Sequence, residues 1–275
     1  MAGDWREDTT RRAKDALIST AVPSAARVAD YLYGGQANFE ADRRAARTLV
    51  EASPVVPLIG PAVRAFQHRL LRFLVGEAGI RQFLDIGTGL PLVGSTHEVA
   101  QSLAAECRIA YVDNDPMVLS HARALLKSAP GGAVGYVDAD VGDPAAIVAG
   151  SRRIIDYQRP VAVMLLFTLA YVSDADQAAA AVSALMAAVP SGSYLALYHL
   201  ASDIDPSLED AVRQWNRLMP TQPMTLRSLE QVTRLAGDLD LVPPGVVPVT
   251  GWRPSPGDPQ FPQPIPVHSL VARKP

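Results

Sequence analysis

Short apolar segments alternate with stretches of helical periodicity from residue 81 to the end of the chain. Such alternation is typical of βαβ units, whose strands pair into a parallel sheet. The segments that fit a strand are RQFLDIG, RIAYVD, AVGYVDAD, VAVMLLF, SYLALYHL, the stretch around LVPPGVVPVTGW, and PVHSLVARK. The pattern predicts an α/β fold built on a seven-stranded, mostly parallel sheet with helices on both faces.

The preceding segment, 23–80, carries apolar side chains at helical spacing instead. Ser24 is placed to cap a first helix, and Gly34 is expected to end it, because glycine accepts the positive φ of a helix stop. A second helix is expected from about Asn38. Three prolines within 54–61 are expected to break the chain before a third, amphipathic helix. The prediction is an N-terminal helical extension of the sheet.

These patterns divide the chain into three parts. Residues 1–22 show no convincing periodicity and are expected to form a flexible arm, 23–80 a helical leader or lid, and 81–275 the ligand-binding domain. Within the last part, Asp115 and Asp143 each place a capping oxygen before a proline at the first helical position. Two helix starts are predicted there.

Charge and cysteine content exclude several kinds of partner and site. The 275 residues include 25 basic and 28 acidic side chains, a net charge of −3, so no long-range field would gather nucleic acid or an anionic membrane. A small or neutral partner fits better. The single cysteine, Cys107, cannot form an intramolecular disulfide. The N-terminus lacks the apolar core of a signal peptide and the apolar run 161–172 is too short to span a bilayer, so a cytoplasmic location is expected.

The most specific feature is FLDIGTGLP, an apolar strand that ends in a glycine turn. Ligands of open parallel sheets bind beyond the carboxyl ends of the strands, where Gly87 and Gly89, on either side of Thr88, would let the backbone approach them. A dinucleotide fingerprint needs a further glycine where Leu92 stands. Asp85 would repel a pyrophosphate but would stabilise the ammonium group of a methionine-type ligand. The turn therefore favours a cationic ligand over a diphosphate.

Acidic residues also end the next two predicted strands. The second ends at Asp113 and Asn114, and Asp113 follows the second glycine of the turn by 24 residues, close to the offset of about 20 for a ribose-binding acid. The third ends at Asp140 and Val141, where an acid could accept a hydrogen bond from the exocyclic amine of adenine. Each acid could instead only cap the next helix, which is the interpretation we favour for Asp115. Together with the acid before the glycine turn, Asp113 and Asp140 favour a bound nucleoside.

Long blocks of the chain resemble a bacterial S-adenosyl methyltransferase family, first catalogued as a domain of unknown function, within the Rossmann-like methyltransferases that use S-adenosylmethionine (SAM). The blocks run from PSAARVADYLYGGQANFEADRRAA through FLDIGTGLP, HEVAQ and YVDNDPMVLSHARALL to PGVVPVTGWRP and ARKP. The resemblance implies a Rossmann-like fold, SAM as cofactor and S-adenosylhomocysteine (SAH) as product. It implies cofactor contacts at Asp85, Gly87, Gly89, Asp113 and Asp140, and a leader that folds over the cofactor around Tyr31, Gly34 and Asn38.

Methyl transfer from a sulfonium is an in-line displacement, in which a protein mainly aligns the nucleophile and keeps water away. A general base helps if the acceptor is a hydroxyl or a protonated amine. His97, after the glycine turn, and His199, in the fifth predicted strand, are the candidates, and each could instead be a helix-start or core hydrogen bonder. Phe167 is expected to flank the methyl group or to belong to the core. His97 and Glu98 lack the second histidine of a zinc-binding helix, so no metal is expected.

We therefore expect a SAM-dependent methyltransferase that acts on an unidentified, small-molecule acceptor. A protein that binds SAM or SAH without methyl transfer, as a sensor or partner subunit, stays open because no base is unmistakable. A nicotinamide oxidoreductase is disfavoured by Leu92. The chain departs from the family pattern at Ser95 and at Tyr198, which leaves the acceptor undefined. Helical leaders serve as dimer surfaces as well as lids, so a homodimer is also open.

Overall fold

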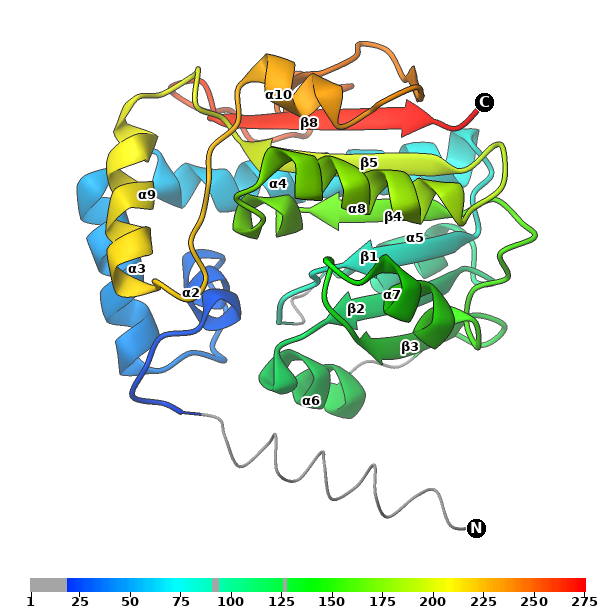
Figure 1. Cartoon of the computed structure of the whole chain (residues 1–275), viewed down its shortest axis with the longest axis horizontal. Coiled ribbons are helices and arrows are strands. Elements are labelled where there is room, and N and C mark those ends of the chain that lie inside the picture. Colours follow the sequence, from blue (N-terminus) through cyan, green and yellow to red (C-terminus); the bar gives the residue numbers. More distant parts are fainter. Residues whose placement is uncertain (1–18, 91–93, 126–127) are drawn as a thin grey trace.

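One eight-stranded sheet forms the centre of the protein in the structure, a computed structural model that describes residues 19–90, 94–125 and 128–275. The strands follow the order β3-β2-β1-β4-β5-β8-β6, and β7 pairs with β8 (Figure 1). β1 to β5 run parallel, and β8 is antiparallel to β5, β6 and β7. The predicted α/β fold with a mostly parallel sheet is confirmed. The strands are β1 Gln82–Ile86, β2 Arg108–Asp113, β3 Ala133–Asp138, β4 Ala162–Leu166, β5 Tyr194–Leu200, β6 Asp240–Leu241, β7 Val247–Pro248 and β8 Val267–Arg273.

The sheet has one strand more than the seven predicted, because the stretch around LVPPGVVPVTGW does not form a single strand. Its start belongs to β6 and its later part to β7. Pro243 and Pro244 lie between the two, and proline has no N–H to donate to a neighbouring strand. Both short strands pair with β8, which also pairs with β5 along its whole length.

Helices cover both faces of the sheet, as predicted (Figure 1). Side chains alternate along each strand, so Phe83 and Tyr111 join the core of one face and Leu84 and Val112 the core of the other. Asp85, two residues after Phe83, therefore belongs to the first face. That face carries α4 (Val56–Arg72), the π-helical η1 (Phe73–Glu77) and α5 (Thr96–Leu103), and the other carries α7 (Pro144–Ser151), α8 (Ala175–Ala187) and α10 (Leu229–Arg234).

Both predicted helix starts are present. α6 (Pro116–Leu125) begins after Asp115, and α7 begins after Asp143. The two carboxylates accept backbone N–H groups of their helices at 2.8 and 3.0 Å, respectively. This satisfies donors that have no partner inside a helix.

The leader forms three helices, α2 (Ala25–Leu32), α3 (Glu40–Ala52) and α4. Gly34 follows α2 with φ +82°, at the helix stop that the sequence predicts. α4 includes Pro57 and Pro61, so the prediction that the prolines break the chain before this helix is wrong. Pro57 lies in the first turn, where a backbone N–H has no partner within the helix, and Pro61 removes only one hydrogen bond.

The leader helices share a core with the sheet. α3 packs against α9 (Ser207–Leu218), and α2, α3 and α9 stand across from the carboxyl ends of the parallel strands (Figure 1). A buried ion pair at 2.9 Å between Arg27 and Asp42 joins α2 to α3. Arg27 also donates to two backbone oxygens within 19–22, so this end of the predicted arm lies against α2. The rest of the arm, 1–18, lies outside the described residues.

Within 19–90, 94–125 and 128–275, no single helix is long and apolar enough to cross a bilayer. The helices Glu40–Ala52 and Val56–Glu77 have that length and apolar character only as a pair, which is bent by 100°. Both contribute side chains to the core that they share with the sheet.

Candidate active site

The order of the strands reverses between β1 and β4, and the glycine turn follows β1 at this point. Ligands of open α/β sheets bind at such a switch point. Gly87 and Gly89 have positive φ values of +72° and +63°, which other residues rarely adopt. The Asp113 carboxylate, at the end of β2, accepts a hydrogen bond from Gly89 N at 3.0 Å. The turn is thereby held against the neighbouring strand.

The two glycines of the turn have different surroundings. A Cβ on Gly87 would overlap the side chain of Thr168, whose hydroxyl donates to the backbone oxygen of Ile86. Gly87 therefore lets η2 (Thr168–Tyr171), at the end of β4, pack directly on the turn. Among the residues that the structure describes, nothing lies within 4 Å of the place where a Cβ of Gly89 would stand. A ligand can approach the backbone there.

A cavity of about 470 Å³, hereafter the large cavity, opens beyond the carboxyl ends of the parallel strands. Small-molecule sites have volumes of roughly 300–1,000 Å³. Separate βα connections meet at this cavity because parallel strands end at one edge of a sheet. The predicted cofactor contacts that line it are Gly87, Thr88, Gly89, Asp113, Asn114, Asp140, Val141 and Phe167.

The acids at the ends of β2 and β3 are held by hydrogen bonds from their own surroundings. Asp113 accepts from Asp115 N at 2.9 Å, and Asp140 accepts from the Asn114 side chain at 2.6 Å. A carboxylate has about four acceptor positions, so each acid keeps capacity for the hydroxyl or amine groups of a ligand. The Ser24 hydroxyl donates to Asp115 at 3.1 Å instead of capping α2, which ties the leader to this edge.

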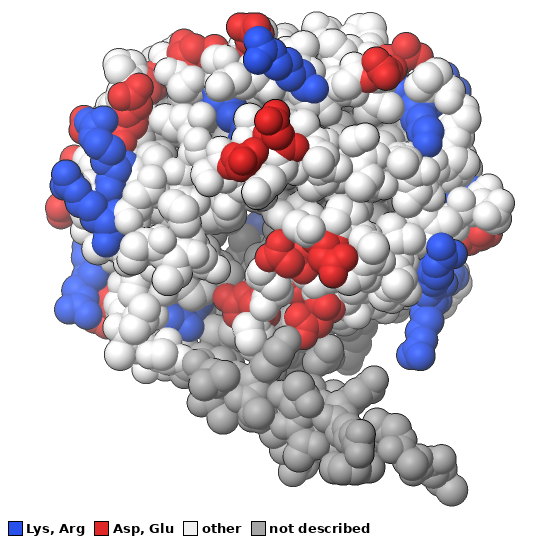
Figure 2. Space-filling model, in the orientation of Figure 1, with Lys and Arg blue, Asp and Glu red and all other residues white. Residues whose placement is uncertain are grey.

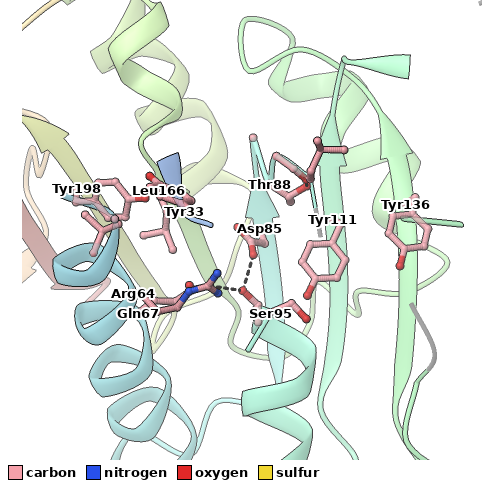
Figure 3. Close-up of a pocket in the computed structure, with 16 residues that line it drawn as sticks. Tyr33, Arg64, Gln67, Asp85, Thr88, Ser95, Tyr111, Tyr136, Leu166 and Tyr198 are labelled. Atoms are coloured by element: carbon pink, nitrogen blue, oxygen red, sulfur yellow. Dashed lines mark hydrogen bonds between the residues drawn. The ribbon is translucent and has the colours of Figure 1, made fainter. Parts of the chain in front are cut away.

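A second cavity of about 110 Å³, hereafter the small cavity, shares the glycine turn with the first. Asp85 lines it from β1, and Arg64 and Gln67 line it from α4 (Figure 3). Gln67 donates to Thr96 Oγ1 at 3.0 Å, and the Thr96 hydroxyl donates to the Asp85 carboxylate at 2.6 Å. Arg64 donates to the backbone oxygen of Gly94 at 3.1 Å and makes no ion pair with Asp85 among those of the described residues. A carboxyl group and a guanidinium thus line one cavity without direct contact.

Two carboxyl groups of the site titrate close to neutral pH. Burial raises the pKa of Asp85 to about 6. The hydrogen bond from Thr96 lowers this pKa in part, and repulsion from Asp113 raises it further. Burial also raises the pKa of Asp113 to about 6, although backbone hydrogen bonds from Asp115 and Gly89 oppose this change. Both groups are mostly ionised at pH 7, and a bound cation would stabilise their ionised form.

Phenol groups form much of the remaining wall of the small cavity. Burial raises the pKa of each, so at neutral pH their hydroxyls are protonated and can donate hydrogen bonds. The Tyr136 hydroxyl is buried and has no hydrogen-bond partner in the described part of the chain. The four side chains are Tyr33, Tyr111, Tyr136 and Tyr198.

Of the two interpretations of His199, as a general base or as a core hydrogen bonder, the structure fits the second. Its side chain is fully buried outside both cavities, with Nδ1 at 2.9 Å from the backbone oxygen of Leu200 and Nε2 against Arg227. A guanidinium can only donate, so Nε2 accepts and Nδ1 carries the hydrogen. Burial lowers the pKa of His199 to about 4, so the ring is neutral. With both nitrogens occupied, His199 is a core hydrogen bonder.

His97 also lies outside the lining of both cavities, contrary to expectation. It is buried in the first turn of α5, with Nδ1 at 2.9 Å from the Tyr111 hydroxyl and 3.0 Å from the Ser95 hydroxyl. Burial lowers the pKa of His97. Its contact with Tyr111 orients a phenol that does line the small cavity.

The leader covers the large cavity through residues other than those expected. Tyr31, Gly34 and Asn38 do not line it, whereas Asp30 and Tyr33 do. Helical phase explains the difference, because residues three apart lie on one face of a helix and Tyr31 is turned about 100° away from Asp30. Asn38 influences the cavity only through Asp30, because its amide donates a hydrogen bond to the Asp30 carboxylate at 2.8 Å.

The charged side chains that line the large cavity from the described residues are all acidic. Figure 2 shows Asp and Glu side chains gathered beside the hollow at the centre of the face of the molecule that it displays. A ligand with net positive charge would be drawn to such an edge. These lining residues are Asp30, Asp113, Asp115 and Asp140.

The residues present fit a sulfonium nucleoside. The open space at Gly89 can take a ligand against the backbone, two acids keep hydrogen-bonding capacity for a ribose and an adenine amine, and Asp85 suits an ammonium group. In the ranges that the structure describes, no group of three or more His, Cys, Asp or Glu side chains could hold a metal ion. Metal independence stays a prediction.

Comparisons with known proteins point to the same chemistry. A family model described as S-adenosyl methyltransferase matches residues 11–275. The chain is similar to a DUF574 family protein from Streptomyces avermitilis, with 38% sequence identity, 93% of this chain and 99% of that chain covered, and a TM-score of 0.89. It is also similar to a candidate methyltransferase from Thermobifida fusca, with 41% identity, 92% of this chain and 96% of that chain covered, and a TM-score of 0.83.

A more distant structure shares the fold alone. The plantazolicin methyltransferase in complex with SAH has 10% identity and a TM-score of 0.53, with 91% of this chain and 95% of that chain covered. No curated protein matches the chain. The family match spans nearly the whole sequence, and the candidate site lies at the switch point where open α/β sheets bind their ligands. The chain is a SAM-dependent methyltransferase and belongs to the S-adenosyl methyltransferase family.

Proposed function

We propose that this enzyme methylates a small molecule bound in the large cavity. When bound, SAM supplies a methyl group on a sulfonium centre. Asp113 would accept hydrogen bonds from the ribose hydroxyls and Asp140 one from the adenine amine, with the backbone of Gly87 to Gly89 beneath the nucleoside. Phe167, which has φ +82° at the end of β4, would border the methyl group.

The orientation of the cofactor is supported by one observation. Asp85 and Arg64 line the same small cavity, and this cavity joins the large one at the glycine turn. The amino-acid tail of SAM carries an ammonium group and a carboxylate, which are stabilised by an anionic and a cationic side chain, respectively. The buried hydroxyl of Tyr136 offers a further donor for the carboxylate. We infer that the tail occupies the small cavity.

Arg64→Met tests this orientation. The variant is expected to bind SAM at least about tenfold more weakly, because a hydrogen bond between charged groups contributes ~1.5–3 kcal/mol. Decarboxylated SAM, which lacks the group that Arg64 would hold, should bind the variant as well as it binds the original enzyme. Calorimetry with both ligands measures the difference, and Arg72→Met, an exposed change on the same helix, is the control. Equal losses for both ligands would contradict the assignment.

Asp113→Ala tests the nucleoside half of the site. SAH should bind this variant about tenfold or more weakly, because two ribose hydroxyls lose a charged acceptor. Asp113→Asn keeps an acceptor for Gly89 N and therefore separates loss of the ligand contact from loosening of the turn. Calorimetry should show adenosine binding more tightly than 2′,3′-dideoxyadenosine only when Asp113 is present. Unchanged SAH affinity in Asp113→Ala would refute the proposed site.

A small-molecule acceptor is supported by the character of the large cavity. No lysine or arginine lines it from the described residues, so phosphate groups of a nucleic acid would find no partner there. Its volume of about 470 Å³ suits a cofactor together with a compact acceptor. The cytoplasmic location and a homodimer stay predictions.

A further inference from the structure

The part of the large cavity that faces away from the glycine turn has an apolar wall, hereafter the acceptor wall. It is built by α3, α4 and α9, the end of β5 and the segment 221–224. Trp215 is 2% exposed and lies with its ring centroid 6.2 Å from that of Tyr171. The side chains that carry the argument are Leu49, Val56, Leu208, Val212, Trp215 and Met224.

Hydrogen bonds between α9 and the segment 221–224 hold the acceptor wall in place. The Trp215 indole donates to the backbone oxygen of Gln222 at 2.7 Å. The Asn216 amide donates to the backbone oxygen of Met224 at 3.0 Å and accepts from its backbone N–H at 2.7 Å. These polar groups satisfy one another, so they do not need hydrogen-bond partners on a ligand.

Charge is distributed unequally between the two parts of the large cavity. The acids that line it come from α2 and from the ends of β2 and β3, on the cofactor side. The acceptor wall contributes no charged side chain from the described residues. A charged acceptor would lose its water there without gaining a partner, and the burial of an unpaired charge is strongly unfavourable.

We propose that the methyl acceptor is an uncharged, mainly apolar molecule of one or two rings that binds against the acceptor wall. This inference rests on the proposed function and defines the substrate class of the same site. Aromatic side chains at the wall favour ring-shaped ligands through edge and stacking contacts. An anionic acceptor is disfavoured further by the acids of the cofactor side.

The reaction that this wall permits needs little help from the protein. A lone pair on the acceptor bonds to the methyl carbon while the sulfur–carbon bond breaks and its electron pair stays on sulfur. A proton on the attacking atom leaves to water. Burial raises the pKa of Tyr171 and Tyr198, so these phenols can donate a hydrogen bond to the acceptor but do not remove its proton at neutral pH. A neutral amine, whose lone pair is available without prior loss of a proton, therefore suits the site.

Three naphthalene probes of nearly equal size test the inference. Neutral 1-naphthol, anionic 1-naphthoate and cationic 1-naphthylmethylammonium are titrated into the full-length protein by calorimetry, with and without saturating SAH. We expect 1-naphthol to bind at least tenfold more tightly than the anion in both conditions, and at least tenfold more tightly than the cation when SAH occupies the acidic cofactor side. Binding of the anion in either condition, or of the cation in the presence of SAH, as tight as that of 1-naphthol would overturn the inference. Failure of SAH itself to bind would instead overturn the proposed function, and the titrations without SAH would still judge the acceptor wall.

Variants locate the binding to this wall. Ala211→Phe fills the cavity from α9 and should weaken 1-naphthol binding at least tenfold while SAH still binds. Leu218→Phe, on the exposed side of the same helix, is the matched control and should change neither affinity. Leu49→Phe fills the cavity from α3 and serves if Ala211→Phe does not fold. Unchanged 1-naphthol affinity in a folded filling variant would overturn the inference.

Discussion

Asp85→Asn is expected to stabilise the ligand-free protein by up to about 3 kcal/mol at pH 7 while it weakens SAM binding about ten- to a hundredfold. Asp85 is 5% exposed, and its pKa is raised from 3.8 to about 6, mainly by burial. At about 1.4 kcal/mol for each pH unit, this difference corresponds to the stated free energy of unfolding. Asparagine can still accept the hydrogen bond from Thr96, so the change removes chiefly the charge.

The pH dependence of this gain has a definite sign. The folded state holds the proton of Asp85 more tightly than the unfolded state does, so ionisation lowers stability as the pH rises from about 4 to about 6. Below this pH range the carboxyl is protonated in both states and does not change the free energy of unfolding. Asp85→Asn should therefore match the original protein near pH 4 and exceed its stability above pH 6. SAM binding by the original protein should weaken as the pH falls through 6.

Urea unfolding of the ligand-free proteins at pH 4 and pH 7.5 measures the stability difference, and calorimetry at pH 7.5 measures the loss of affinity. Asp238→Asn is the control, because Asp238 is an exposed acid outside both cavities. A gain of the same size at both pH values would show that ionisation of Asp85 is not the cause. An unchanged affinity for SAM would remove Asp85 from the cofactor site.

Gly87→Ala is expected to destabilise the protein by about 2–5 kcal/mol, the sum of a left-handed backbone cost and an overpacking cost. Both glycines of the turn have positive φ, but among the described residues only a Cβ at Gly87 would overlap another side chain, that of Thr168. Gly89→Ala should cost only the backbone part, about 1–2 kcal/mol. Gly89 lines both cavities, and the added methyl group would project into space that a ligand could occupy. Gly89→Ala should therefore chiefly weaken SAH binding.

Urea unfolding and SAH calorimetry on both variants separate the two effects. Thr168→Ala, combined with Gly87→Ala, removes the overlapping hydroxyl and methyl groups and should recover part of the lost stability. The combination is a double-mutant cycle, because Thr168→Ala alone gives the cost of losing the hydrogen bond to Ile86. Additive losses would mean that the overlap does not explain the cost of Gly87→Ala. Equal stability losses in the two glycine variants would lead to the same conclusion.

The cofactor side of the site was predictable because its signals are local. Asp85 and the glycines lie within five consecutive residues, Asp113 ends a recognisable apolar strand, and Asp140 follows the next such strand by two residues. Parallel strands bring all their carboxyl ends to one edge, so recognising the strands is enough to bring these residues together. The structure places them around two connected cavities at that edge.

The sequence left two interpretations of each candidate histidine open, and it could not reveal why neither ring lines a cavity. His199 does end an apolar strand, but its Nε2 is occupied by Arg227, which follows 28 residues later. His97 is drawn to Tyr111 of the neighbouring strand. In both cases a partner distant in sequence decides which way the ring turns. The sequence on either side of each histidine does not indicate that partner.

The sequence by itself determined the α/β fold, the family and the sheet edge at which the candidate residues meet, because apolar periodicity, glycine conformation and strand-end acids act over short stretches of chain. Only the tertiary structure decided that Arg64 and Asp85 line one small cavity, and that α3 and α9 close an uncharged wall over the other end. On an amphipathic helix, Arg64 has the pattern of a solvent-exposed residue. Its role depends on which surface that helix packs against, and this is set by the whole core rather than by any neighbouring residue.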